Sequence, residues 1–266
     1  KGRIQDLKPS LDQLDGHLAG NPVQSSADWL EVEAQTQRLR DSSPMIEDES
    51  VDVIVSNCVL NLVRDSDRKQ LFSEMHRILR RGGRAVISDI VCDEAVPDGL
   101  RNDPKLWSGC MSGAFREDEF LQAFEEAGFY GIEIVSTQQE PWAIVEGIEF
   151  RSITVRAWKG KEGPCIERSQ AVIYTGPWKA VIDDDGHRLN RGQRMAVCDK
   201  TFQIYSSRPY GDQIIPVPPQ LEIPLEGAAS FDCSHFGVRD PKVTKNGMLS
   251  LTQLPDEDCC GPSGCC

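Results

Sequence analysis

Long apolar segments and a glycine-rich loop are both missing from this sequence of 266 residues. No run approaches the roughly 20 apolar residues that a transmembrane helix requires, and the first residues, KGRIQDLKPS, lack the apolar core of a signal peptide. The second missing segment is a GxGxxG loop, the motif that commonly cradles a nucleotide cofactor at the start of a helix. Because the sequence shows neither a transmembrane run nor a signal-peptide core, we expect a cytoplasmic protein without a membrane span.

Positive charge is also scarce. The chain has 29 basic and 42 acidic residues, which gives a net charge of -13. Such a charge repels the phosphates of nucleic acids and the headgroups of anionic lipids. We predict that neither nucleic acid nor a membrane surface is a partner, and that a small neutral or soft ligand is.

Cysteine, in contrast, is abundant. Six of the ten cysteines are scattered singly, and the other four end the chain in CCGPSGCC. In a reducing compartment such cysteines are mostly free thiols, and soft thiolates prefer soft metals or metalloids. The scattered positions are Cys58, Cys92, Cys110, Cys165, Cys198 and Cys233.

A strand and helix alternation begins at Val51. The segment VDVIVSN is a nearly continuous apolar run, which predicts a parallel strand covered on both faces. Apolar residues at helical spacing predict a helix over 66–80, capped by Asp65 or Ser66 and ended by Gly82-Gly83. Further elements are expected as a strand at 84–90, a helix at 117–127 and strands at 131–137 and 150–158. This alternation indicates an open α/β sheet.

Composition divides the chain into three parts. We expect a first domain at 1–158, in which the polar stretch 8–50 is a surface insertion with one or two helices. A smaller, mainly β domain follows at 159–239, where AVIYTGPWKAVIDDDGH predicts a hairpin or meander with an Asp-Gly turn. The tail 240–266 has little apolar content and is expected to be disordered.

The residues after the first apolar strand are candidate ligands. In open α/β sheets, ligands bind at the carboxyl ends of the strands, where Ser56, Asn57 and Cys58 follow VDVIV. The Asn57 amide is suited to a polar cofactor group. Cys58 is either a small buried residue or part of the cofactor pocket.

Several motifs together identify a family. The segments SNCVLNL, HRILRRGGR, ISDIV, RNDPKLWSGCMSGA and IEFRSITVR resemble the arsenite S-adenosylmethionine methyltransferases. The resemblance covers most of 51–200 and implies a class I, Rossmann-like sheet. The family's acidic glycine-rich cofactor loop and a further arsenic-binding cysteine would precede Lys1, so the resemblance implies an N-terminally truncated member that lacks the first strands.

The same resemblance implies the site residues. Cys110 and Cys165 match the family's arsenic-binding thiols, which would hold arsenite or its thiol conjugates with the As(III) lone pair free to attack a sulfonium methyl group. What remains of the S-adenosylmethionine site would be Ile4 and Gln5 at the adenine edge, with Asn57 and Cys58. Thioredoxin or glutathione is implied as the reductant, and a monomer is expected.

Three interpretations stay open. The first is an arsenite methyltransferase that detoxifies arsenic but is inactive as this fragment. The second is a methyltransferase of the same fold that acts on a quinone, a sterol or another small molecule. The third is a thiol-rich protein that binds arsenite or a metal without catalysis, which the missing cofactor loop favours. The terminal CCGPSGCC is either a chaperoning tail for arsenite or a solvated segment.

Overall fold

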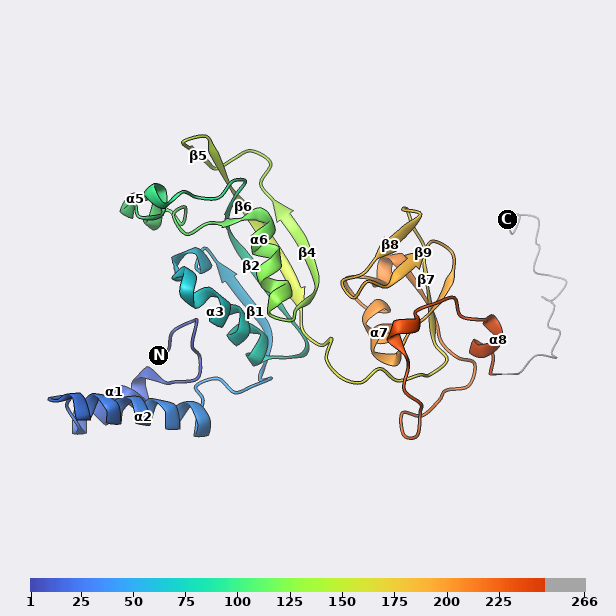
Figure 1. The fold of residues 1–266 in the computed structure, drawn as a ribbon, viewed down its shortest axis with the longest axis horizontal. Coiled ribbons are helices and arrows are strands. Elements are labelled where there is room, and N and C mark those ends of the chain that lie inside the picture. The colour runs from blue at the N-terminus through green and yellow to red at the C-terminus, as the bar shows by residue number, and fades with distance from the viewer. Residues whose placement is uncertain (247–266) are drawn as a thin grey trace, which may run out of the picture. The chain divides into compact units, whose positions relative to one another are not determined.

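The computed structural model describes residues 1–246, which fall into two compact units (Figure 1). The first unit is Lys1–Lys161, and the second begins at Glu162. Within 1–246, no helix has both the length and the apolar character that crossing a membrane requires. The predicted role of CCGPSGCC concerns positions beyond the described residues.

The first unit is built on a mixed sheet with the strand order β1-β2-β6-β4. Strand β1 (Val51–Asn57) is parallel to β2 (Leu79–Cys92), whereas β6 (Ile148–Trp158) is antiparallel to both β2 and β4 (Tyr130–Thr137). Two short strands extend the sheet: β3 (Phe115–Arg116) pairs with β2, and β5 (Ala143–Val145) pairs with β6. This arrangement confirms the predicted α/β class.

Two helices, α3 (Asp65–Ile78) and α6 (Glu117–Glu126), lie against one face of this sheet (Figure 1). Their aromatic residues form the centre of the core, where the rings of Phe72 and Phe124 meet edge to face at 4.9 Å. On β1, Ile54 packs against this core while Val55 is 74% exposed. The prediction that this strand is covered on both faces is therefore wrong, because alternate side chains point away from the helices and no described element covers them.

The ends of α3 also differ from the prediction. Asp65 is the first helical residue, and Arg64 precedes it without a side-chain cap. The helix ends at Ile78 because Leu79 is already extended, with φ -68° and ψ 138°. The pair Gly82-Gly83, expected to end the helix, lies inside β2 instead and exchanges backbone hydrogen bonds with Lys159.

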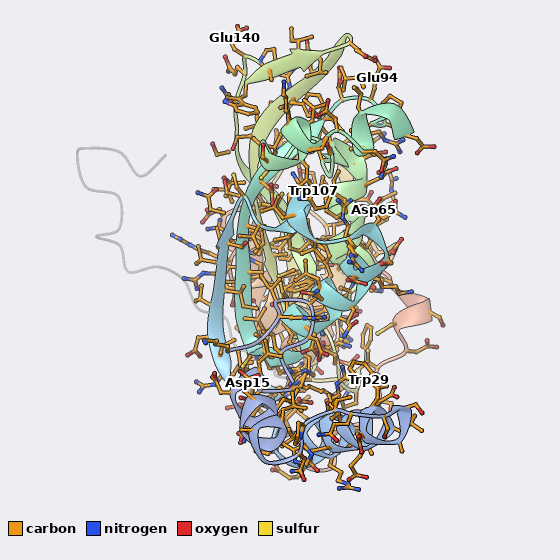
Figure 2. All side chains as sticks on the ribbon, turned by 90° about the vertical axis from the view of Figure 1, so that its left-hand side faces the viewer. Asp15, Trp29, Asp65, Glu94, Trp107 and Glu140 are labelled. Carbon is orange, nitrogen blue, oxygen red and sulfur yellow. The ribbon has the colours of Figure 1, made fainter. Side chains whose placement is uncertain are left out.

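A helical pair lies at one end of the first unit. As predicted for 8–50, this stretch contains two helices, α1 (Leu11–Gly20) and α2 (Ser26–Ser42), and none of their residues is buried. Figure 2 shows Asp15 and Trp29 on this pair at the bottom of the view, far from Glu94 and Glu140 at the top.

The second unit is rich in short strands. Strand β7 (Ala171–Tyr174) is central and antiparallel to β10 (Arg194–Ala196) and β11 (Ile214–Val217), and β8 (Ala180–Ile182) forms the predicted hairpin with β9 (Arg188–Asn190). Its helical segments are α7 (Asp199–Tyr205), η2 (Gly211–Gln213), η3 (Cys233–His235) and α8 (Pro241–Thr244). Helix α8 lies in the stretch expected to be disordered. It is ordered because Asp240 caps it and the Thr244 carbonyl accepts a hydrogen bond from the Gln220 amide.

Candidate thiol site at the ends of the strands

The first part of the site is the loop that leaves β1. The Cys58 amide donates to the Ser88 carbonyl at 2.9 Å, which continues the parallel pairing of β1 with β2 by one residue. The chain then turns into the short helix η1 (Leu60–Leu62). Cys58 therefore stands at the carboxyl end of β1, beside its parallel neighbour β2, and open α/β sheets bind ligands at the carboxyl ends of their strands.

The second part of the site follows two short helices, α4 (Asp98–Arg101) and α5 (Pro104–Ser108). Asp103 begins α5 by accepting a hydrogen bond from the Lys105 amide at 2.7 Å, and proline at the first helical position suits this start. The Cys110 amide donates to the Trp107 carbonyl at 3.0 Å, which closes the turn after α5.

Asn61 joins these two loops. Its buried amide nitrogen donates to the carbonyl of Ile90 at 2.6 Å and to that of Cys110 at 3.0 Å. Gly113 approaches Asn61 so closely that an added Cβ would lie 2.0 Å from the Asn61 carbonyl oxygen. Arg68 donates to the Gly113 carbonyl from α3. These contacts fix the position of Cys110 relative to the end of β1.

These contacts bring Cys110 beside the backbone of Cys58, and we call Cys58 and Cys110 the thiol pair. The Cys110 Sγ lies 3.6 Å from the Cys58 carbonyl oxygen. Both cysteines have positive φ, 52° at Cys58 and 60° at Cys110, and they are two of six such non-glycine residues among those the structure describes. This backbone conformation costs energy and is concentrated at functional sites. Cys110 is buried and Cys58 is exposed, so the pair opens to solvent on one side.

Burial and a nearby buried carboxylate, Asp89, shape the electrostatics of the pair. Asp89 is 1% exposed and accepts hydrogen bonds from the amides of Leu60 and Ile90, both at 2.9 Å. Burial raises the pKa of Asp89, and these amide donors oppose the rise. Burial first and the Asp89 charge second raise the pKa of the Cys110 thiol. Local desolvation and Asp89 likewise raise the pKa of Cys58, although the residue as a whole is exposed.

The two thiols expected to bind arsenic have different neighbours. Cys110 belongs to the first unit and lies beside Cys58, whereas Cys165 belongs to the second unit. The sulfur atoms of Cys165, Cys198 and Cys233 all lie within 4.8 Å of one another. The alternative that Cys58 is a buried structural residue is wrong, because it is exposed in the turn after β1.

The residues expected at the cofactor site provide part of a binding surface. Asn57 is exposed at the end of β1, and beside it the Ser56 hydroxyl is buried without a hydrogen-bond partner among the described residues. Ile4 packs against the core, and its neighbour Gln5 is half-buried in the turn before α1. Ser56 and Asn57 are consecutive strand residues, so their side chains point to opposite faces of the sheet, and Asn57 is the exposed one.

Sequence reasoning missed three residues that build the site: Asn61, Asp89 and Gly113. A signal for them was present, since each lies in a segment already singled out, namely SNCVLNL, ISDIV and MSGA. The segments alone do not indicate that these three residues come together in space. The structure brings all three segments to one edge of the sheet through the contacts of Asn61.

Comparison with known proteins finds a family model that matches part of each unit. Residues 24–128 match a family described as a methyltransferase domain, and residues 161–249 match a domain of unknown function, DUF8838. Together with the mixed sheet, the first match supports a Rossmann-like methyltransferase fold for the first unit.

The sequence relatives are more specific. The chain is 34% identical over 171 residues to an arsenite methyltransferase of Aquipseudomonas alcaligenes, a match that covers 59% of this chain and 48% of that protein. It is 28% identical over 236 residues to the arsenite methyltransferase of Homo sapiens, covering 83% of this chain and 62% of that protein. The predicted family is thus confirmed: by sequence the chain is a relative of the arsenite methyltransferases.

Coverage and structural similarity are partial. The chain spans 48% to 62% of the length of these two relatives. Among solved structures, the arsenic(III) S-adenosylmethionine methyltransferase of Chlamydomonas reinhardtii is 25% identical, with a TM-score of 0.43, and the match covers 70% of this chain and 64% of that chain.

Proposed function

We propose that this chain is the arsenic-binding part of an S-adenosylmethionine-dependent arsenite methyltransferase, and that the thiol pair Cys58 and Cys110 holds the arsenic. The observation that carries the proposal is the approach of the Cys110 sulfur to within 3.6 Å of the Cys58 carbonyl oxygen, in two loops fixed by Asn61. The sequence relatives named arsenite methyltransferase support the choice of substrate. They also favour it over a quinone or a sterol.

The chemistry of binding needs no charged nucleophile at the start. Two thiols displace two hydroxyl groups from arsenous acid, so that two As–S bonds form, two As–O bonds break, and each thiol proton leaves in a water molecule. Raised pKa values of the two thiols are compatible with this exchange, because protonated thiols enter and water leaves, so that the total charge does not change. The arsenic keeps one oxygen and its lone pair, which the exposed side of the pair leaves accessible.

The same proposal includes a cofactor site on the first unit. S-adenosylmethionine would supply an electrophilic methyl group on a sulfonium centre. Asn57 would bind one of its polar groups, and Ile4 and Gln5 would contact its adenine edge. The protein gains rate by positioning the lone pair and excluding water, since no proton is removed from the arsenic.

Several finer assignments are part of the proposal. The resemblance predicts Cys165 as the arsenic ligand that accompanies Cys110; this is the alternative to Cys58 in that role, and substitution of Cys165 distinguishes the two. A thiol reductant of the thioredoxin or glutathione type would return oxidised arsenic to the trivalent state. We further propose a cytoplasmic monomer.

The experiment combines site-resolved alkylation with an activity assay. Arsenite is added to the purified chain, the free thiols are alkylated, and peptide mass spectrometry reports which cysteines are protected. We expect Cys58 and Cys110 to be protected together, and each single serine variant to lose protection of the other. The full-length protein of the same gene, assayed with labelled S-adenosylmethionine, arsenite and glutathione, should form methylated arsenicals and lose this activity in both variants.

Cys165→Ser is the matched comparison. If Cys110 and Cys165 share the catalytic arsenic, this variant loses methyl transfer as completely as Cys110→Ser. Unprotected Cys58 and Cys110 at saturating arsenite would contradict the proposed site. Protection without any methyl transfer by the full-length protein would instead support the non-catalytic binding protein.

A further inference from the structure

A cluster of three thiols lies in the second unit, whereas the thiol pair belongs to the first unit. The sulfur atoms of Cys165, Cys198 and Cys233 lie within 4.8 Å of one another, and all three cysteines are free. No described carboxylate or imidazole belongs to the group, which is all sulfur. We call these residues the thiol triad.

Backbone hydrogen bonds hold the three segments of the triad together. The Phe231 amide donates to the Cys165 carbonyl at 2.9 Å, and the Asp199 amide donates to the Ile166 carbonyl at 2.8 Å. Residues 165–167 thus lie between the segment that carries Cys198 and the one that carries Cys233. The cysteines are brought together before any ligand binds, which reduces the entropy that binding must overcome.

Ion pairs reinforce the same arrangement. Arg168 donates to the Asp199 carboxylate at 2.8 Å, and Arg239 donates to both oxygens of Glu167 at 2.9 and 3.0 Å. The arginine side chains are largely buried, so these pairs are screened less than those at the surface. The residues next to the triad are therefore anchored by contacts that do not involve sulfur.

One sulfur atom of the triad is buried and held by a hydrogen bond, and the other two are accessible to a small ligand. Cys198 is 1% exposed, and its sulfur accepts a hydrogen bond from the Thr201 amide at 3.5 Å. Cys165 and Cys233 are half-buried, so a small ligand reaches the triad from their side. Burial, followed by a hydrogen bond with Cys165, raises the pKa of Cys233 to about 12.

We propose that the thiol triad is a second binding site, which holds a trivalent thiophilic metalloid ion of the As(III) class through three sulfur atoms. Soft thiolates select soft acceptors, and a set without oxygen donors excludes Mg²⁺ and Ca²⁺. Zn²⁺ takes four ligands in structural sites, whereas As(III) is saturated by three and directs its lone pair to the fourth position. The triad therefore matches arsenic in number as well as in softness.

The binding step balances without a redox partner. Three As–S bonds form, three As–O bonds of arsenous acid break, and the three thiol protons leave with the hydroxyl groups as three water molecules. No oxygen remains on the arsenic, so this site retains arsenite rather than presenting an exchangeable position. The proposal does not rest on methyl transfer by the thiol pair.

The test uses the full chain with its other accessible thiols removed. Cys58, Cys110 and the four tail cysteines are replaced by serine, and the chain is titrated with arsenite and, separately, with zinc. We expect one arsenic per chain and the loss of three reactive thiols at saturation. Serine at Cys165, Cys198 or Cys233 should each weaken arsenite binding by about tenfold or more.

The controls separate binding from folding. Cys198→Ser keeps a hydroxyl that can cap α7, and circular dichroism melting without arsenite reports whether the second unit remains folded. Cys92→Ser, at a fully buried cysteine of the first unit, should leave arsenite affinity unchanged. Arsenite affinity unchanged in the folded Cys198→Ser and Cys233→Ser variants would overturn the proposal. Retention of zinc against excess arsenite would overturn it as well.

Discussion

The thiol pair and the thiol triad are two ways of arranging cysteines in one chain, and they differ in the number of sulfur atoms and in what holds them. The pair lies at the end of a parallel strand, and a buried amide fixes Cys110 beside the Cys58 loop. In the triad, three distant segments are joined by backbone hydrogen bonds and arginine pairs. Two thiols leave arsenic one exchangeable position, whereas three saturate it. We infer that the pair suits turnover and the triad suits retention.

The largest expected effect comes from breaking the pair. Cys110→Ser in the full-length protein should lower methyl transfer by more than the about 10- to 100-fold that loss of an outer supporting contact typically costs. Cys198→Ser should leave methyl transfer within about threefold of the unmodified protein while it weakens arsenite retention. Measured rates of methylarsenical formation check both. Equal losses in the two variants would contradict the division of roles.

Asn61→Asp tests the amide that joins the two loops. A carboxylate cannot donate to the carbonyls of Ile90 and Cys110, and it would place an uncompensated charge in a buried position. We expect a loss of about 3–5 kcal/mol in unfolding free energy, measured by urea denaturation of the first unit. Asn61→Ala should cost less, about 1–3 kcal/mol, because it buries no charge. A neutral result for Asn61→Asp would mean that this contact does not support the pair.

Gly113→Ala tests the contact between the two loops by a change in packing that leaves the Asn61 amide intact. The added methyl group would lie 2.0 Å from the Asn61 carbonyl oxygen, so the backbone must shift. Overpacking of this kind costs about 1–3 kcal/mol, and we expect weaker protection of Cys110 by arsenite in addition. Gly99→Ala is the matched control, because nothing lies within 4 Å of its added Cβ. Indistinguishable urea midpoints for the two variants would contradict the close approach.

The smallest expected effect is a shift with pH. Burial and Asp89 raise the pKa of Cys110, so its alkylation rate should reach half its maximum above the ordinary cysteine value of about 8.5. Because the folded thiol keeps its proton to higher pH than the unfolded one, its contribution to stability is present below the unfolded pKa and is lost as pH rises through the raised value. Removal of the charge in Asp89→Asn should lower the alkylation midpoint. A midpoint at or below the ordinary value would contradict the assigned environment.

The sheet was predictable because its elements have strong local signals. The apolar runs of β1 and β6 and the periodicity of α3 and α6 appear within a few residues of the predicted bounds. The start of α3, where Asp65 is already helical and no side chain caps the helix, and the exposure of one face of β1 were not predictable, because they depend on neighbours outside the segment. The apolar run VDVIVSN predicts that Val55 is a core residue, yet Val55 is 74% exposed.

The site was predictable as a set of motifs but not as a set of contacts. The sequence points to Cys110 as a thiol ligand and to Asn57 and Cys58 at a strand end, without indicating that Cys58 and Cys110 come together. That proximity depends on the turn after α5 and on the Asn61 amide. Cys165 has no local signal that links it to Cys198 and Cys233, because only the pairing of three distant segments brings them together.

The most direct test of the two arrangements is X-ray absorption at the arsenic edge, which counts sulfur neighbours. Two variants of this 266-residue chain, both with serine at the four tail cysteines, are each loaded with one equivalent of arsenite. In the first variant the three cysteines of the thiol triad are also replaced by serine, so that the thiol pair remains. In the second variant Cys58 and Cys110 are replaced instead, so that the thiol triad remains. We predict two sulfur atoms and one oxygen around arsenic in the first, and three sulfur atoms in the second. The same coordination in both chains would contradict the account.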